Sequence, residues 1–484
     1  MKNIEEEIEA AIGRLDELYQ DAVAALKSSL AQFVKDKVPP NAAQRAKFRY
    51  PQIKLVYEPD GPTPISSRAY AKFNAPGTYV TTVTHPKEFA QYLREQLVPL
   101  VGEYGAKLTV EYSDQEIPYA YVVDGQHELG VGDVPPDELA RWFPTPSLNS
   151  VGDEIVDGLW DFGNDDSRPL GLYDALRVDY SLKRLMHYSG TDWQAFQPWI
   201  LFTNYARYVD EFVRWAANEI QYPESPYYKL VCSGGVDITI ENADDAVNLV
   251  AGGSWRKYQM PAYHLLSKEG DGITLVNIGV GPSNTKNITD HLAVLRPNCW
   301  LMVGHCGGLR QSQKIGHYVL AHAYLRRDNV LDDILPVSVP IPPIAEVQIA
   351  LQNAAIKVTG EAPEALKRRL RTGTVVSFAD RNWELYWSSE RQLINMSRAI
   401  GVDMESCMVA AQGFRHRVPY GTLLCISDKP VHGEIKLPGA ANVFYERAIG
   451  EHLKIGIVTL ETMRAKEAVI HSRKLRSFDE PPFR

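Results

Sequence analysis

The chain has 484 residues, which at roughly 150 residues per domain predicts two to four domains. It is 45% hydrophobic and 23% charged, a balance that is typical of globular proteins and excludes a disordered, collagenous or disulfide-stapled chain. The formal charge of −9 disfavours nucleic acid as a partner, because proteins that wrap nucleic acid usually carry a surplus of basic residues.

Neither the apolar runs nor the N-terminus indicates a membrane or a secretory route. No apolar run approaches the roughly 18 to 20 residues that a membrane span requires, and the acidic first segment lacks the apolar stretch of a secretory signal. The five cysteines are sparse, odd in number and mostly embedded in apolar runs, so we expect buried, reduced thiols. The sequence therefore predicts a cytoplasmic protein with no membrane partner.

Residues 1–190 predict a smaller α+β domain. Apolar residues three or four apart over residues 4–35 indicate an amphipathic helix. Alternating Tyr- and Thr-rich stretches such as residues 79–84 indicate strands, and a helix is expected over residues 86–104 before a strand at residues 107–112. Nothing here has the spacing of a catalytic motif, so we expect a regulatory or oligomer-contacting domain.

Residues 191–484 predict an α/β domain, because short apolar runs alternate with helical patterns and glycine turns. The expected strands are residues 228–232, 273–281, 299–308, 317–325, 373–377 and 421–427, with helices between them such as residues 284–296 and 344–358. Ligands of such sheets bind at the carboxyl ends of the strands. The polar residues that directly follow these runs are therefore the candidate site residues.

The first such motif is a glycine turn, Gly279-Val-Gly281-Pro-Ser283-Asn284, between an expected strand and an expected helix. Backbone N–H groups at a helix N-terminus can bind an anion. The alternative is a tight turn in which Ser283 or Asn284 is the N-cap. The motif is no complete GxGxxG, since position 284 is Asn.

The second motif, Gly304-His305-Cys306-Gly307-Gly308, ends the run at residues 299–308. Adjacent His and Cys side chains are possible metal ligands, but no CxxC or HxxxH pattern completes a site. No metal site is predicted. A glycine turn that brings the backbone close to a ligand is the favoured interpretation.

Three carboxylates lie where catalytic acids are found. Asp403 and Glu405 flank Met404 just before an apolar helix, and Asp428 directly follows the run at residues 421–427. An Asp at the carboxyl end of a strand is placed as a general acid or base would be. The alternatives are helix capping for the first two and an Asx turn for the third.

In this order the four motifs resemble the purine nucleoside phosphorylase and nucleosidase superfamily, over roughly residues 225–465. The longer strings LVNIGVGPSN, GHCGGLR, DRNWEL, VDMES and ISDKPVHGEIKLPG, together with the added N-terminal part, resemble its bacterial AMP nucleosidase family. The resemblance implies a three-layer α/β catalytic domain with a mixed central sheet. It also implies the reaction of AMP with water to give adenine and ribose 5-phosphate.

The same resemblance assigns roles to three site residues. Asp428 is expected to donate a proton to the departing purine, so its carboxyl group has to be protonated while it acts. Glu405 is expected to bind the ribose hydroxyl groups as positive charge develops on C1′, and Met404 to pack against the ribose. No metal or cofactor is needed for this chemistry.

Departures from the phosphorylase pattern point to water as the nucleophile. Phosphorylases of the superfamily hold phosphate with an Arg in a GDP-x-R turn after the first strand; we align that turn with residues 232–237, which contain no Arg. The Arg and Ser of their R-V-G-S-C-G motif are replaced by Met302 and His305. His305 is a candidate for orienting the water.

Adenine recognition is expected in residues 380–384, where Asn382 offers a paired donor and acceptor and Trp383 a stacking face. The alternative is that Trp383 is a core anchor. Ser283, in the glycine turn, is a further substrate-binding candidate.

The 5′-phosphate of the substrate requires a separate basic site. Candidates are Tyr205 and Arg207, which precede the expected catalytic sheet, and Lys429 and Lys436 after the catalytic Asp. The alternative for Arg207 is a solvated helical face with ion pairs.

Two other classes of function remain as alternatives: a phosphorylase that acts on another nucleoside, and a non-enzymatic adenylate sensor. A nicotinamide-dependent oxidoreductase is disfavoured, because no complete glycine fingerprint is followed by an acidic residue. Resemblance alone implies a homo-hexamer, allosteric activation by ATP with Mg²⁺, and a role in purine salvage and adenylate-level control.

Overall fold

The computed structural model describes residues 2–123, 128–160, 167–435, 442–465 and 473–484, and the chain forms two compact units. Unit 1 contains residues 1–183 and 476–484, and unit 2 contains residues 184–475. The sequence analysis placed a single boundary at residue 190. In the structure the last nine residues belong to unit 1 as well. There the Phe483 amide donates to the Leu170 carbonyl at 2.9 Å.

Unit 1 is an α+β domain with a sheet in the order β3-β1-β2-β4. Helix α1 packs along this sheet and buries Ile8, Leu15 and Leu26, as the three- and four-residue spacing predicted. The elements are α1 (Lys2–Asp36), α2 (Ala42–Arg45), β1 (Arg49–Tyr57), β2 (Gly77–Thr82), α3 (Ala90–Gly102), β3 (Lys107–Glu116), α4 (Tyr119–Val122), α5 (Pro136–Trp142) and β4 (Arg168–Pro169), and α6 (Ala175–Ser189) leads into unit 2.

Unit 2 is built on a mixed sheet that has, within the described residues, the order β13-β12-β11-β14-β10-β5-β9-β8-β6-β7. Its strands are β5 (Trp199–Thr203), β6 (Tyr227–Cys232), β7 (Val236–Ile238), β8 (Ala262–Ser267), β9 (Ile273–Asn277), β10 (Cys299–Gly308), β11 (Tyr318–Arg327), β12 (Leu370–Phe378), β13 (Gly401–Asp403) and β14 (Tyr420–Asp428). Its helices are α7 (Ala206–Gln221), α8 (Ala246–Gly252), α9 (Pro282–Leu292), α10 (Ala345–Thr359), α11 (Pro363–Leu366), α12 (Trp387–Ser397), α13 (Ser406–His416) and α14 (Asn442–Arg464). The α/β class predicted for this part of the chain is confirmed.

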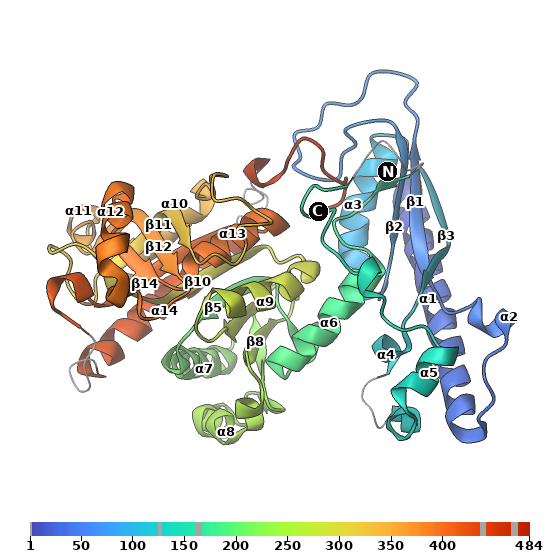
Figure 1. Cartoon of the computed structure of the whole chain (residues 1–484), viewed down its shortest axis with the longest axis horizontal. Helices are drawn as coiled ribbons and strands as arrows, with labels where there is room; N and C mark the ends of the chain where they lie inside the picture. The colour runs from blue at the N-terminus through green and yellow to red at the C-terminus, as the bar shows by residue number, and fades with distance from the viewer. Residues whose placement is uncertain (1, 124–127, 161–166, 436–441, 466–472) are drawn as a thin grey trace. The chain divides into compact units, whose positions relative to one another are not determined.

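Helices cover both faces of the central strands, which gives three layers (Figure 1). Residues an odd number apart on a strand face opposite sides. On β10, the Trp300 indole donates to the Val409 carbonyl of α13 at 3.2 Å. Val303 contacts Gly456 of α14, where an added Cβ would lie 2.9 Å from its Cγ1. Thus α13 and its neighbour α9 cover one face, and α14 with α7 and α10 covers the other.

Part of the sheet closes on itself. β13 pairs with β12 and also with β10, while β11 and β14 complete the circuit, so β10-β13-β12-β11-β14 form a closed ring. Gly307 is paired with Val402 on one side and with Asp428 on the other. The ring therefore joins the two segments that carry the predicted catalytic residues.

Strand β5 was not predicted, although it lies in the middle of the sheet between β10 and β9. Its five residues, WILFT, are all buried, and a short apolar run without alternation cannot be distinguished from a buried helical segment. All five cysteines are buried free thiols, as predicted. Within the described residues, none of the helices has both the length and the apolar character that crossing a membrane requires.

Candidate active site

The candidate active site lies where the carboxyl ends of four parallel strands meet. β9, β5, β10 and β14 are neighbours in this order and run parallel. The segments that follow β5, β9 and β14 begin with Asn204, Ile278 and Lys429. This is the edge at which sheets of this type bind ligands.

Glu405 is buried at this edge, and both of its carboxyl oxygens accept hydrogen bonds. It is 1% exposed. Its Oε1 accepts a hydrogen bond from the Gly281 amide at 2.6 Å, and its Oε2 accepts one from Asn204 Nδ2 at 3.0 Å. Burial, together with the neighbouring Asp403, raises the pKa of Glu405 to about 8. Three loops, after β5, β9 and β13, thus converge on one carboxyl group.

Asp403 and Glu405 have different hydrogen-bond partners. Asp403 accepts hydrogen bonds from the Ser406 amide at 2.9 Å and from Ser377 Oγ at 2.5 Å, and so caps the first turn of α13. Burial raises the pKa of Asp403 as well. Glu405 makes no capping hydrogen bond, and its carboxyl group contacts the neighbouring loops instead.

Asp428 ends β14, where Ser427 Oγ donates to its Oδ1 at 2.5 Å. Two glycines of the GHCGG motif let side chains of both β13 and β14, the strands that flank this part of β10, approach its backbone closely. A Cβ on Gly307 would lie 3.0 Å from Val402 Cγ1, and one on Gly308 would lie 3.0 Å from Ile426 Cγ2. The glycines therefore serve strand packing around the site, in addition to any approach to a ligand.

The glycine turn before α9 differs in detail from the expectation. Neither Ser283 nor Asn284 caps the helix: the N-cap is Gly281, whose φ of +109° suits a residue without a side chain. Ser283 is exposed in the first turn of α9. The turn contacts the site through the Gly281 amide, which donates a hydrogen bond to Glu405.

His305 and Tyr205 were both predicted as site residues, and the structure brings them together. Their ring centroids are 4.5 Å apart, and Tyr208 lies 5.5 Å from the His305 ring on the α7 side. His305 is adjacent in sequence to Gly304, so the two face opposite sides of β10. Asn204 packs on the Gly304 side, where an added Cβ would lie 3.3 Å from its Oδ1.

The remaining predicted residues differ in their settings. Met404 is half-buried between the two carboxylates, and Arg207 is exposed in the first turn of α7. Lys429 is buried and pairs with Glu434 at 2.5 Å. Lys436 lies outside the described residues.

Trp383 has the packing environment that was the alternative to adenine stacking. It is 7% exposed, stacks on Phe378 at 5.6 Å and contacts Trp387 edge-on at 6.1 Å. Asn382 precedes it, exposed, at the start of a short 3₁₀ turn. Of the two residues, only Asn382 presents an accessible polar side chain.

The structure corrects the assignment of the phosphorylase-type turn to residues 232–237. This turn joins β6 to β7 at the edge of the sheet, and β6 is antiparallel to β8. The first strand of unit 2 is β5, and the turn after it is Thr203-Asn204-Tyr205-Ala206-Arg207. This turn lies at the site and contains an Arg in the final position of the GDP-x-R pattern.

Asn204 contacts Glu405, a role that the sequence did not predict, because the residue was noted only as part of this segment. Its amide holds Glu405, which is 201 positions away in the sequence. In the sequence, the feature that could have indicated Asn204 is its position directly after the apolar run at residues 199–203. Using that feature requires recognising the run as a strand.

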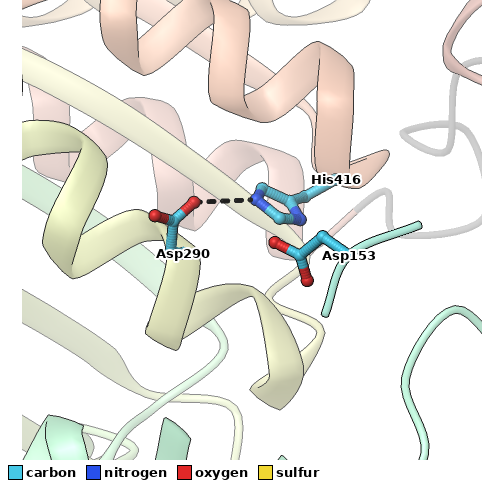
Figure 2. Close-up of side chains that lie close together, drawn as sticks. All are labelled: Asp153, Asp290 and His416. Atoms are coloured by element: carbon cyan, nitrogen blue, oxygen red, sulfur yellow. Dashed lines mark ion pairs between the residues drawn. The ribbon is translucent and has the colours of Figure 1, made fainter. Parts of the chain in front are cut away.

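A polar cluster ties together the far ends of α9 and α13, whose first residues follow Gly281 and Glu405. Figure 2 shows Asp290 of α9 facing the ring of His416 of α13, at 3.5 Å. Lys286 and Arg415 also pair with Asp290, at 2.6 and 3.1 Å. Burial would raise the pKa of Asp290, but His416 and Lys286 hold it well below its usual range. The cluster thereby fixes the two helices that present the site loops.

Comparison with known proteins identifies the family. The family described as "Bacterial AMP nucleoside phosphorylase N-terminus" matches residues 10–167, and the phosphorylase superfamily matches residues 245–448. The AMP nucleosidase of Escherichia coli K12 is 53% identical over 478 residues, which cover 98% of each chain. The chain belongs to the AMP nucleosidase family. The Escherichia coli O157:H7 protein of the same name matches equally well.

Among solved structures, the AMP nucleosidase of Bacteroides thetaiotaomicron is 28% identical. It covers 60% of this chain and 98% of its own, with a TM-score of 0.43. A purine nucleoside phosphorylase of Toxoplasma gondii, solved with immucillin-H, is 16% identical over 57% of this chain and 95% of its own, with a TM-score of 0.40. In this AMP nucleosidase family member, the glycine turn contacts Glu405, and the GHCGG motif pairs with the strands that lead to Glu405 and end in Asp428.

The raised pKa of Glu405 predicts how stability depends on pH. Between about pH 4.5 and 8 the folded protein keeps a proton on Glu405 that the unfolded chain has released, so stability should fall as pH rises. Glu405→Gln removes this proton difference. The free energy of unfolding of the variant should therefore increase relative to wild type by about 1 kcal/mol or more from pH 5 to pH 8, measured by urea unfolding. A difference that is constant with pH would contradict the raised pKa.

Proposed function

We propose that this protein hydrolyses the N-glycosidic bond of AMP to give adenine and ribose 5-phosphate. The observation that supports the proposal is the pairing of Gly307 with both Val402 and Asp428: the strand that leads to Glu405 and the strand that ends in Asp428 flank β10. Membership of the AMP nucleosidase family supports AMP as the substrate.

In this reaction the purine is a poor leaving group, and positive charge develops on the ribose. Asp428 donates a proton to the purine ring as the bond to C1′ breaks. Glu405, held by Gly281 and Asn204, binds the ribose hydroxyl groups, and Met404 lies beside it to pack against the sugar. A carboxyl group that is already fixed in a buried site holds the ribose hydroxyl groups without reorganising as the reaction proceeds.

Water rather than phosphate is the proposed nucleophile. Met302 and His305 replace the Arg and Ser with which related phosphorylases hold phosphate, and the His305 ring packs against Tyr205 and Tyr208. Incubation with AMP, with and without added phosphate, tests this choice. We expect adenine and ribose 5-phosphate in both samples. Adenine that forms only with phosphate, together with ribose 1,5-bisphosphate, would identify a phosphorylase instead.

Arg207 is the proposed contact for the 5′-phosphate, because it is exposed in the turn that also carries Asn204. Its guanidinium fork suits a dianion. Arg207→Ala should raise the KM for AMP by about 10- to 100-fold, since a hydrogen bond to a charged group contributes roughly 1.5 to 3 kcal/mol. Cleavage of adenosine, which lacks the phosphate, should hardly change.

Arg214→Ala is the matched control, because Arg214 lies on the same helix and pairs with Glu211 at 2.8 Å on the surface. It should leave both substrates unaffected. Equal loss of AMP and adenosine cleavage in Arg207→Ala would assign Arg207 a structural role and direct the search to Lys429 and Lys436.

The resemblance supports the other parts of the proposal: a cytoplasmic homo-hexamer that serves purine salvage and adenylate-level control, with ATP and Mg²⁺ as an allosteric activator. No cofactor takes part in the chemistry, and Asn382 contacts adenine. Unit 1, which is separate from the catalytic sheet, is the proposed regulatory part. Light scattering tests the hexamer, and initial rates with and without ATP and Mg²⁺ test the activation.

A further inference from the structure

We propose that Asn204 is a positioning residue for the attacking water: its Nδ2 holds Glu405 while its Oδ1 accepts a hydrogen bond from the water. The inference rests on the proposed hydrolysis and names the group that orients its nucleophile. Neither the motifs nor the family resemblance assigns this role to any residue other than His305, which faces the other side of β10.

The first argument is the orientation of the amide. Nδ2 donates to Glu405 Oε2 at 3.0 Å, and an amide nitrogen can donate hydrogen bonds but cannot accept them. The amide nitrogen is therefore committed to Glu405. The oxygen of the same planar amide has to point away from Glu405. The two ends of the side chain therefore contact different parts of the site.

The second argument is that this oxygen lacks a protein partner. Asn204 Oδ1 is buried, and within the described residues no side-chain or backbone donor makes a hydrogen bond to it. Leaving a buried acceptor unpaired costs roughly 1 to 3 kcal/mol. Such atoms in a native site need an explanation, and a bound water or substrate atom is an ordinary one.

The third argument is the position of the oxygen. It lies over Gly304, where an added Cβ would be 3.3 Å away, and Gly304 belongs to the motif with which related phosphorylases hold their phosphate nucleophile. The neighbouring Glu405 is the ribose contact. An acceptor at this point lies next to the proposed ribose contact, at the carboxyl-terminal end of β10.

The chemical step balances without a base at Asn204. The C1′–N9 bond breaks and its electron pair stays with adenine, which takes a proton from Asp428. The water oxygen forms the new bond to C1′, and its surplus proton passes to solvent, from which Asp428 is reprotonated. The amide accepts a hydrogen bond and orients the water, but takes no proton.

Competition between water and methanol tests the role, because methanol gives methyl ribofuranoside 5-phosphate in place of ribose 5-phosphate. Asn204→Ala should lower kcat for AMP by roughly 10- to 100-fold, the scale of a misplaced reactant, with less than a threefold change in KM. The ratio of methyl riboside to ribose product should change at least threefold from wild type, since the water is no longer favoured by a fixed acceptor.

Asn248→Ala is the matched control. Asn248 Nδ2 also donates to a carboxylate, that of Asp245 at 2.7 Å, but on the exposed helix α8. This variant should keep the wild-type rate and product ratio. If Asn204→Ala does not fold, Asn204→Ser takes its place with the same measurement.

The outcomes separate the inference from the proposed function. A lower kcat with an unchanged product ratio would overturn the positioning role and leave Asn204 only as a support for Glu405. Failure of the wild-type enzyme to release ribose 5-phosphate would instead overturn the hydrolysis itself. A changed ratio in Asn204→Ala, with a wild-type ratio in Asn248→Ala, is the result we expect.

Discussion

Asp428→Asn should lower kcat for AMP by about 10²- to 10⁴-fold, the range in which a general acid contributes to catalysis. The amide can still accept the hydrogen bond from Ser427 Oγ, which is 2.5 Å from Asp428 in the wild type. It cannot deliver a proton to the purine. The loss should therefore fall on kcat, with KM for AMP and the melting temperature little changed.

Asp237→Asn is a suitable control for this substitution, because Asp237 of the edge strand β7 pairs with Lys229 of the neighbouring β6 at 2.6 Å. We expect wild-type turnover from it. A turnover of Asp428→Asn within about threefold of wild type would mean that another group protonates the purine.

Glu405→Gln should lower kcat/KM for AMP by about 10²- to 10³-fold, the effect of removing one preorganised electrostatic contact. The Gln amide in the variant also cannot satisfy both neighbouring donors. Both oxygens of Glu405 accept from donors, Gly281 N–H and Asn204 Nδ2, so a Gln amide must turn its own NH₂ group toward one of them. The contact with the ribose and its support are lost together.

The substrate 2′-deoxy-AMP identifies which contact is lost. Removing the hydroxyl and changing Glu405 remove the same interaction, so their effects should be strongly non-additive in a cycle of two enzymes and two substrates. We expect Glu405→Gln to lower kcat/KM much less for 2′-deoxy-AMP than for AMP. Fully additive losses would place Glu405 away from the 2′-hydroxyl.

The two carboxylates could be found from the sequence because each adjoins a recognisable apolar pattern. Asp428 ends an apolar run, and Glu405 precedes an apolar helix. The choice between capping and chemistry could not be made from sequence, because Asp403 and Glu405 are two residues apart and only their partners, Ser377 and Gly281, distinguish them.

The environment of Asn204 could not be predicted in the same way. It depends on β5, whose five buried residues have no periodicity, and on pairing with β9 and β10, which follow it by about 70 to 100 residues. For Trp383 the sequence suggested a role that its contacts do not favour. An aromatic residue beside polar neighbours suggested a face for stacking, but its ring packs against Phe378 and Trp387. Contacts between segments distant in sequence decide both cases.

The closed ring of strands restricts where the chain can gain or lose residues. A one-residue slip in a strand turns every side chain to the opposite face, and in the ring β13 is paired on both sides. An insertion there would move Asp403 off Ser377 and carry Glu405 away from Gly281. Changes of length are therefore confined to connections outside the ladders, such as residues 328–344 between β11 and α10. Divergence of this enzyme by insertion can alter its surface while the spacing of its catalytic carboxylates is preserved.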